Sequence, residues 1–127
     1  MEIESLGYRV LGLAIEVHKH LGPGLLESAY ERCLIQELES NRIKYKTQLP
    51  IDIQYKGKAM EAGFRMDMLI DERIILELKC IEAVKPIHLA QILTYLRLSK
   101  LSLGYIINFN TTTLMKGVKR VVNDHNL

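Results

Sequence analysis

Apolar side chains recur every three or four residues over the first forty positions, a spacing that predicts two amphipathic helices. We expect the first helix over residues 5–20, with Ser5 as its cap, and the second over residues 25–40, ending at Asn41. Gly22-Pro23-Gly24 lies between them, and this sequence stops a helix and allows a sharp turn. The residues expected on the buried sides are Leu6, Val10, Leu13, Ala14, Val17 and Leu21 in the first helix, and Leu26, Ala29, Tyr30, Cys33, Leu34 and Leu38 in the second.

The pattern then changes to a period of two, which is typical of strands. A first strand is predicted over residues 49–55, where Pro50 indicates a sheet edge or a strand start. A second strand is predicted over residues 60–70 and a third over residues 74–80, joined by a turn at residues 71–73. The third strand is apolar on both faces apart from two charged positions, so we expect it at the centre of the sheet.

The last third of the chain predicts one more helix and one more strand. Pro86 favours a helix start, and apolar residues follow it at helical spacing over residues 86–99. A fourth strand is expected over residues 103–109, and a short helix or irregular tail from Thr112. The order ααβββαβ predicts an α/β sandwich on a mixed sheet, with a single domain over residues 1–127.

Composition places the chain among ordinary globular proteins. Its 127 residues fit one core, 25% of them are charged, and the net charge of +2 is too small by itself to indicate a nucleic-acid partner. No apolar run approaches the roughly 20 residues of a membrane span, and residues 1–5 lack the basic segment of a signal peptide. We expect a soluble cytoplasmic protein without a membrane partner, in which Cys33 and Cys80 are buried thiols rather than a disulfide.

Two carboxylates and a lysine stand out in strands that are otherwise apolar. Asp67 lies in the second strand, and Glu77 and Lys79 lie in the third. Charged groups in such runs are costly unless they are paired or bind a metal. Carboxylates on adjacent strands offer the hard oxygen ligands that suit Mg²⁺, and Lys79, two residues after Glu77, faces the same side of its strand. This set predicts metal-assisted cleavage of a phosphodiester.

The strand register decides whether these carboxylates meet. Asp67 opposes Glu77 only in a register that leaves residues 71–73 as a three-residue turn, and the same register opposes Arg65 with Lys79. Spacing alone favours another interpretation, an amphipathic hairpin with charge pairs between Asp67 and Arg65 and between Glu77 and Lys79. On the face of the second strand opposite to Asp67, regular alternation places four residues: Phe64, Met66, Met68 and Ile70.

Five segments form an ordered set along the chain: Gly24-Leu25-Leu26-Glu27-Ser28-Ala29-Tyr30, Arg65-Met66-Asp67, Glu77-Leu78-Lys79, His88-Leu89-Ala90-Gln91 with Tyr95, and Ile107-Asn108-Phe109. This set resembles the signature of the GxxExxY family, a branch of the PD-(D/E)xK nuclease-like superfamily, and covers about residues 6–122. The resemblance implies a restriction-endonuclease-like αβββαβ core with a mixed central sheet flanked by helices, here with an extra N-terminal helix. It also implies Mg²⁺ or Mn²⁺ as the cofactor and DNA or RNA as the substrate.

The same resemblance assigns roles to individual residues. Asp67 and Glu77 are expected to be metal ligands, and the backbone carbonyl of Leu78 to complete the metal shell. Lys79 is expected to orient or activate the attacking water and to stabilise negative charge on the phosphate. Glu27 is expected to reach the metal directly or through water. Its alternative is a helix-dipole role, because it lies in the first turn of the second helix.

Polar residues of the third helix and one histidine complete the set of candidates. Gln91, Tyr95 and His88 lie near one helix face, and the resemblance places Gln91 beside the site, where it would hold a ligand carboxylate or a phosphate. A solvated helix face is the alternative for all three, and it carries more weight for Tyr95 and His88. His18 is expected to be buried and hydrogen-bonded, bracing the corner between the first two helices, rather than to be a ligand.

Other chemistries fit the sequence less well. The chain has no CxxC or HExxH for zinc, no GxSxG and no phosphate-binding glycine loop. The first expected function is a metal-dependent nuclease, which the intact set of Asp67, Glu77 and Lys79 favours. The second is a non-catalytic nucleic-acid-binding or protein-assembly module. DNA is preferred to RNA as the expected partner, and the short chain with little net charge favours a homodimer or a protein partner as well.

Overall fold

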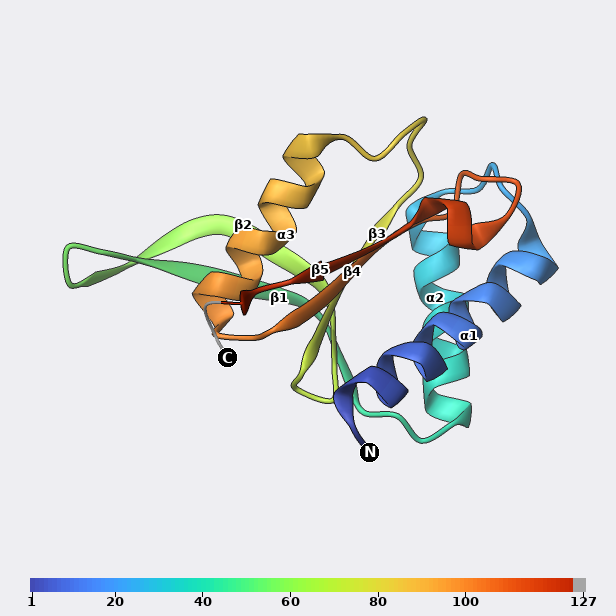
Figure 1. Ribbon diagram of the computed structural model, residues 1–127, viewed down its shortest axis with the longest axis horizontal. Helices are drawn as coiled ribbons and strands as arrows, with labels where there is room; N and C mark the ends of the chain where they lie inside the picture. The colour runs from blue at the N-terminus through green and yellow to red at the C-terminus, as the bar shows by residue number, and fades with distance from the viewer. Residues whose placement is uncertain (125–127) are drawn as a thin grey trace.

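The computed structural model describes residues 1–124 of the chain, without the side chain of Ala62. In this part of the chain the strands form a five-stranded sheet in the order β1-β2-β3-β4-β5 (Figure 1). Strands β3 and β4 are parallel and the other neighbours are antiparallel, so the predicted mixed sheet is confirmed. In chain order, the elements are α1 (Ile3–Leu21), α2 (Glu27–Ser40), β1 (Tyr45–Tyr55), β2 (Lys58–Ile70), β3 (Ile74–Lys79), α3 (Pro86–Ser99), β4 (Leu103–Asn108), the 3-10 helix η1 (Leu114–Gly117) and β5 (Val118–Val122).

The first two helices form as predicted, with different starting residues. Helix α1 begins at Ile3, before the expected cap Ser5, because Ile3 packs against the core. It ends at Leu21 and is capped by Gly22, whose φ of 69° lies in the left-handed region that glycine adopts without strain. Helix α2 begins at Glu27 and ends at Ser40, with the predicted end signal Asn41 as its C-cap. Within residues 1–124, none of the helices combines the length and the apolar character needed to cross a lipid bilayer.

The strands agree with the prediction in the middle of the sheet and differ at the end of the chain. Strand β3 is central as expected, and Pro50 lies in the edge strand β1, where its missing N–H costs no ladder hydrogen bond. From Thr112 onward the prediction was a short helix or an irregular tail. The structure instead has η1 followed by β5, which pairs with β4 and forms the second edge of the sheet. The missed strand is only five residues long, too short for alternation to be distinctive.

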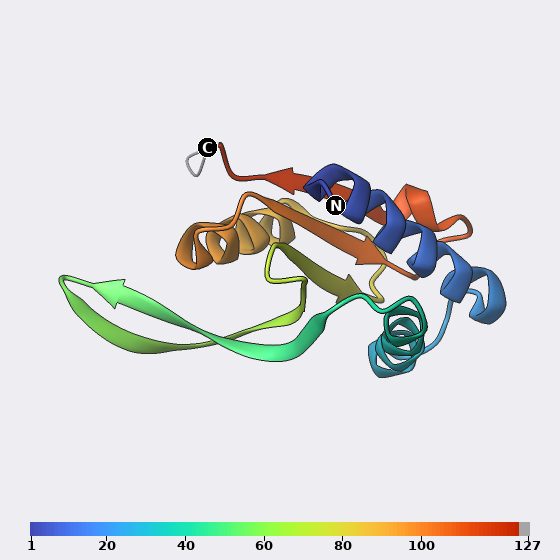
Figure 2. The same cartoon turned by 90° about the horizontal axis from the view of Figure 1, so that it is seen from below.

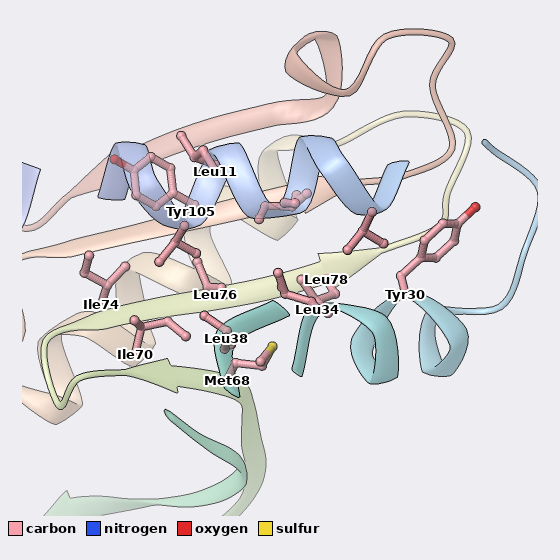
Figure 3. Close-up of a cluster of buried hydrophobic side chains, with 14 of the residues drawn as sticks. Leu11, Tyr30, Leu34, Leu38, Met68, Ile70, Ile74, Leu76, Leu78 and Tyr105 are labelled. Atoms are coloured by element: carbon pink, nitrogen blue, oxygen red, sulfur yellow. The ribbon is translucent and has the colours of Figure 1, made fainter. Parts of the chain in front are cut away.

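The sheet separates two hydrophobic clusters. One lies between the sheet and helices α1 and α2, where Leu34 and Leu38 of α2 face Leu76 and Leu78 of β3 (Figure 3). The other lies between the sheet and α3 and contains Ile92, Tyr95 and Leu96 of that helix, together with Ile51, Met66, Leu69, Ile75 and Ile106. Cys33 and Cys80 are free thiols, and both are half-buried rather than fully buried.

Strands β1 and β2 are longer than the other strands and form a hairpin that extends past α3 (Figure 2). Their pairing shifts between Ile51 and Asp52, where β2 carries two extra residues, Ala62 and Gly63. Gly63 has a φ of 71°, which explains why glycine occupies this position. The bulge divides the hairpin into an inner half that belongs to the sheet and an outer half that projects from it.

Candidate active site

The ladder between β2 and β3 ends where the two predicted metal ligands begin. Ile70 pairs with Ile74 and Met68 pairs with Leu76, which confirms the predicted register and the turn at residues 71–73. The next pair in this register would be Asp67 and Glu77, and it is not part of the ladder. The two side chains replace it with two hydrogen bonds of 2.8 Å. The backbone N–H of Asp67 donates to Glu77 Oε2, and the backbone N–H of Leu78 donates to Asp67 Oδ2.

The backbone around Asp67 is irregular on its other side as well. On β1, Thr47 pairs with Met68 and Leu49 pairs with Met66, but Gln48 between them has a φ of 52° and does not pair with Asp67. Asp67 therefore lies at a gap in both ladders. At this gap the two carboxylates accept the hydrogen bonds of the N–H groups of Asp67 and Leu78.

This irregularity corrects the predicted faces of β2. Met68 packs on the α1 and α2 side, whereas Met66 packs on the α3 side, so the two do not share a face. Arg65 pairs with Pro50 of β1 and is not opposite Lys79, because the β2–β3 ladder has already ended. Among the described residues no ion pair joins Asp67 to Arg65 or Glu77 to Lys79. The interpretation as an amphipathic hairpin held by these charge pairs is therefore wrong.

The two carboxylates lie in surroundings that disfavour their charge. Glu77 is only 7% exposed, and its pKa is raised to about 8, mainly by burial and next by the negative charge of Asp67. Burial also raises the pKa of Asp67, and Glu27 and Glu31 add to the rise. The backbone hydrogen bonds and the positive charge of Lys79 oppose these effects in both residues. Without a further cation, the surroundings do not fully stabilise the ionised forms of both Asp67 and Glu77.

Lys79 lies at the end of β3, where β4 holds the strand and the segment that follows. The backbone carbonyl of Lys79 accepts a hydrogen bond of 2.9 Å from the N–H of Phe109. Asn108 is paired with Lys79 and is buried, and its side chain bonds both backbone groups of Ile81, with Nδ2 donating at 2.9 Å and Oδ1 accepting at 3.1 Å. No role for Asn108 was predicted from the sequence. Its signal was a lone amide in an otherwise apolar strand.

The turn between α1 and α2 brings Glu27 toward the carboxylates. The hydroxyl of Tyr30 donates to the carbonyl of Gly22 at 2.5 Å and accepts from the N–H of Leu25 at 3.2 Å, so it closes the turn. Glu27, one helical turn before Tyr30, is exposed, and its charge contributes to the raised pKa values of Asp67, Glu77 and Cys80. Yet residues 1–124 contain no group of three or more His, Cys, Asp or Glu side chains that could hold a metal ion. Glu27 thus borders the pair and does not form a three-carboxylate set with it.

His18 is buried and hydrogen-bonded, as the sequence predicted. Its Nε2 lies 3.1 Å from the carbonyl oxygen of Phe109 and 2.9 Å from that of Thr111, and it donates its proton to them. The partners differ from the expected ones. The ring ties the end of α1 to the segment after β4, not to the corner between the two helices. It thereby supports the same segment that holds Lys79.

Helix α3 borders the site from the other sheet face. Tyr95 is buried rather than solvated, its ring centroid lies 5.7 Å from that of Phe64, and its pKa is raised by burial and then by Glu77 and Asp67. Gln91 is exposed, and it lines a hollow of about 180 Å³ together with Phe64, Ile87, Ala90, Thr94 and Tyr95. The remaining candidate, His88, accepts a hydrogen bond at Nδ1 from the N–H of Lys85 and so caps α3.

The match to known families covers nearly the whole chain. A family model of the PD-(D/E)XK nuclease superfamily matches residues 4–121. The chain belongs to this superfamily. No curated protein and no solved structure matches the chain. The three helices and the mixed sheet are consistent with the restriction-endonuclease-like fold of PD-(D/E)XK nucleases, as the sequence predicted.

Members of the superfamily typically use divalent metals, and the donor set near Asp67 and Glu77 fits such an ion. Each carboxylate accepts one backbone hydrogen bond, and the raised pKa values show that added positive charge would stabilise both ionised groups. Hard carboxylate oxygens suit Mg²⁺ and Mn²⁺. Mg²⁺ often takes only one or two protein carboxylates and keeps several waters, so a third acidic side chain is not required.

Proposed function

We propose that the protein is a metal-dependent nuclease that hydrolyses phosphodiester bonds in nucleic acid, with DNA preferred to RNA. The observation that carries this proposal is the pair of hydrogen bonds by which Asp67 and Glu77 replace the next step of the β2–β3 ladder. A merely structural strand pair would continue the ladder with backbone groups alone. A buried and a half-buried acidic side chain, held together at a strand end, lower stability unless a cation joins them.

In this proposal Asp67 and Glu77 hold Mg²⁺ or Mn²⁺, and the backbone carbonyl of Leu78 is a further donor. The bound ion supplies Lewis acidity and lowers the pKa of water. Lys79, whose charge acts on both carboxylates, orients the attacking water and stabilises negative charge on the phosphate. Glu27 acts through water, which is consistent with its exposed position at the first residue of α2.

Gln91 is assigned to the substrate in this proposal. It is exposed on α3 and lines the hollow beside Phe64 and Tyr95. Its amide offers two donors and one acceptor, so it can bind a phosphate oxygen or a ligand carboxylate. The narrower family assignment to GxxExxY is supported by Gly24 in the turn before α2 and by Glu27 and Tyr30 at the start of α2. A cytoplasmic location is supported by the two free thiols.

A non-catalytic nucleic-acid-binding or protein-assembly module is the second candidate. The finding that favours it is the lack of a third acidic side chain beside Asp67 and Glu77 among the described residues. The finding against it is Lys79. A binding module has no need of a lysine close to the carboxylates of Asp67 and Glu77, because their negative charge weakens the attraction of the lysine for phosphate.

Cleavage of labelled single-stranded and double-stranded DNA and RNA tests the proposal, with Mg²⁺, with Mn²⁺ and with a chelator. We expect metal-dependent cleavage that falls by orders of magnitude in Asp67→Asn and Glu77→Gln. Asp52→Asn, at an exposed position in the hairpin, is the matched control and should keep full activity. If the wild-type protein binds these substrates but cleaves none of them with either metal, the binding module is the better interpretation.

A further inference from the structure

The outer half of the β1–β2 hairpin projects away from the rest of the protein. Both views show its tip beyond the end of α3 and at the opposite end of the molecule from α2 (Figure 1, Figure 2). From residue 52 to residue 61, none of the residues is buried, and Ile53 alone is half-buried. A two-stranded hairpin is marginally stable in water unless one face is covered. This projecting half therefore offers a surface that suits a partner.

The two faces of the outer hairpin differ in chemistry. Residues that are directly opposed point to the same side. Ile53 pairs with Met60 and Tyr55 pairs with Lys58, and we call these four residues the arm face. Tyr55 is 55% exposed and Met60 is 46% exposed. The opposite face carries polar and small residues in the pairs Asp52 with Glu61 and Gln54 with Ala59.

The arm face continues toward the candidate active site. Alternation along β1 puts Ile51 on the same side as Ile53, and Ile51 belongs to the cluster under α3. Ile51 pairs with Phe64, whose ring contacts that of Tyr95. Glu77 lies on this side too, because it is two residues from Ile75, which belongs to the same cluster. The negative charge of Glu77 also raises the pKa of Tyr95, which lies in that cluster. The hairpin tip and the carboxylates are thus joined by one side of the sheet.

Charge is divided between the two faces. Lys58 lies on the arm face, and Lys56 at the tip places Nζ 5.5 Å from the ring centroid of Tyr55. The acidic residues of the outer hairpin, Asp52 and Glu61, lie on the other face. An exposed aromatic ring beside two ammonium groups complements a chain of phosphates with planar bases. It suits a second copy of this chain less well, because a two-fold contact brings the same lysines together.

We propose that the arm face binds a nucleic-acid strand that also reaches the carboxylate site, with Lys56 and Lys58 on phosphates and Tyr55 stacked on a base. This inference rests on the proposed function, because it takes nucleic acid to be the substrate. It adds a binding region remote from the chemistry, which sets the minimum substrate length. A strand must span from the tip to the site to gain the contacts of both.

Binding and cleavage are measured separately to test it. Binding of labelled single-stranded DNA is followed by fluorescence anisotropy with Ca²⁺ in place of Mg²⁺, over a range of salt concentrations. The double variant Lys56→Gln with Lys58→Gln should bind more weakly. The negative slope of log K against log salt should become shallower by about 1.4, which corresponds to the loss of two phosphate contacts to a single strand. Tyr55→Ala should weaken binding by roughly tenfold, because it removes one stacked base.

A matched control removes the same charge elsewhere. Arg42 and Lys44 have the same spacing as Lys56 and Lys58 and are exposed where α2 leads into β1, and their double change to Gln should leave the slope unchanged. Cleavage at saturating substrate should stay at the wild-type rate in the control variant, Arg42→Gln with Lys44→Gln, since neither residue belongs to the arm face or to the carboxylate site. If the two double variants show the same slope of log K against log salt, the arm face does not bind nucleic acid, even if the wild-type protein cleaves it.

Two further outcomes separate this inference from the proposed function. If the wild-type protein binds DNA through Lys56 and Lys58 but does not cleave it, binding by the arm face is supported and the proposed nuclease activity is contradicted. Sedimentation is measured on the same samples. A dimer without DNA that is lost in Tyr55→Ala with Met60→Ala would show that a second copy covers the arm face, and would overturn nucleic acid as its partner.

Discussion

The ring of Tyr30 in α2 stacks on the ring of Phe109 just after β4, with centroids 4.3 Å apart and planes 11° from parallel. The same tyrosine donates its hydroxyl to Gly22. One side chain therefore joins the turn before Glu27 to the segment whose N–H binds the carbonyl of Lys79. Through these contacts Tyr30 holds the turn before α2 against the segment after β4, and both segments border the site.

Tyr30→Phe should test this relationship with little change in volume. The ring stack remains, but the carbonyl of Gly22 and the N–H of Leu25 lose their part-buried hydrogen bonds, a loss that at about 0.5–1.5 kcal/mol each lowers the free energy of unfolding by about 1–3 kcal/mol. Urea denaturation measures this loss. Tyr8→Phe is the control, since Tyr8 is 73% exposed and should change stability by less than about 0.5 kcal/mol. Equal stability of the two variants would show that the hydroxyl does not close the turn.

Glu77 should make the metal-free protein less stable as the pH rises. Its folded pKa of about 8 lies above its ordinary value of 4.5, so the folded state binds the proton more tightly. The stabilisation is complete below the unfolded pKa and is lost as the pH rises through the folded pKa, by up to about 1.4 kcal/mol per pH unit between them. Asp67, whose pKa is also raised, adds a contribution of the same sign.

Glu77→Gln isolates this effect, because glutamine keeps an oxygen to accept the N–H of Asp67 but does not titrate. The difference in unfolding free energy between wild type and variant should grow in favour of the variant as the pH rises toward 8. Urea denaturation in a chelator at several pH values measures it. A difference that is constant with pH would contradict a raised pKa for Glu77.

Binding of Mg²⁺ should release a proton near neutral pH. Glu77 is largely protonated below its pKa of about 8, and a carboxylate must be ionised to bind a hard cation. Calorimetry at pH 7 in two buffers of different ionisation enthalpy should count up to about one proton released per ion, and the count should fall toward zero above the pKa. Affinity should rise with pH over the same interval. Proton release that is unchanged in Glu77→Gln would place the titrating group elsewhere.

The sequence was sufficient to predict the element order, the central position of β3 and the β2–β3 turn, because these follow from hydrophobic period and loop length. It was also sufficient to predict the register that brings Asp67 beside Glu77, although side-chain hydrogen bonds replace the ladder at that step. It failed where the backbone leaves the regular pleat. Gln48 with a φ of 52° interrupts β1 beside Asp67, and alternation then assigns Met66 to the wrong face. No local pattern marks this break, because it depends on side chains that replace ladder hydrogen bonds.

The supporting residues of the site were harder to predict than the charged ones. Asn108 acts through two bonds to Ile81, 27 positions earlier in the chain, and only the parallel pairing of β3 with β4 brings them together. A solvated face was the alternative weighed for Tyr95, but the residue is buried, and its ring contacts that of Phe64 from β2. Long-range contacts of this kind have no sequence period. A lone polar residue in an apolar strand, as at Asn108, is the useful signal.

The role of Lys79 can be tested by separating charge from shape. Lys79→Ala should lower the rate of cleavage about 10²–10³-fold, because it removes a group that stabilises charge in the transition state. Metal binding should persist or tighten, because an ammonium is not a ligand and its charge opposes a cation. Cleavage of labelled DNA with Mn²⁺, run beside a metal titration, measures both quantities.

Lys79→Arg completes this test. The guanidinium keeps the positive charge, but it is bulkier than an ammonium and does not give up a proton. If Lys79 positions or activates water, Lys79→Arg should therefore keep the charge and still fail to cleave. The half-buried position at the end of β3, beside Asp67 and Glu77, leaves little room for the larger group. Full activity in Lys79→Arg would reduce the role of Lys79 to that of a simple positive charge. Unchanged cleavage in Lys79→Ala would remove it from the mechanism.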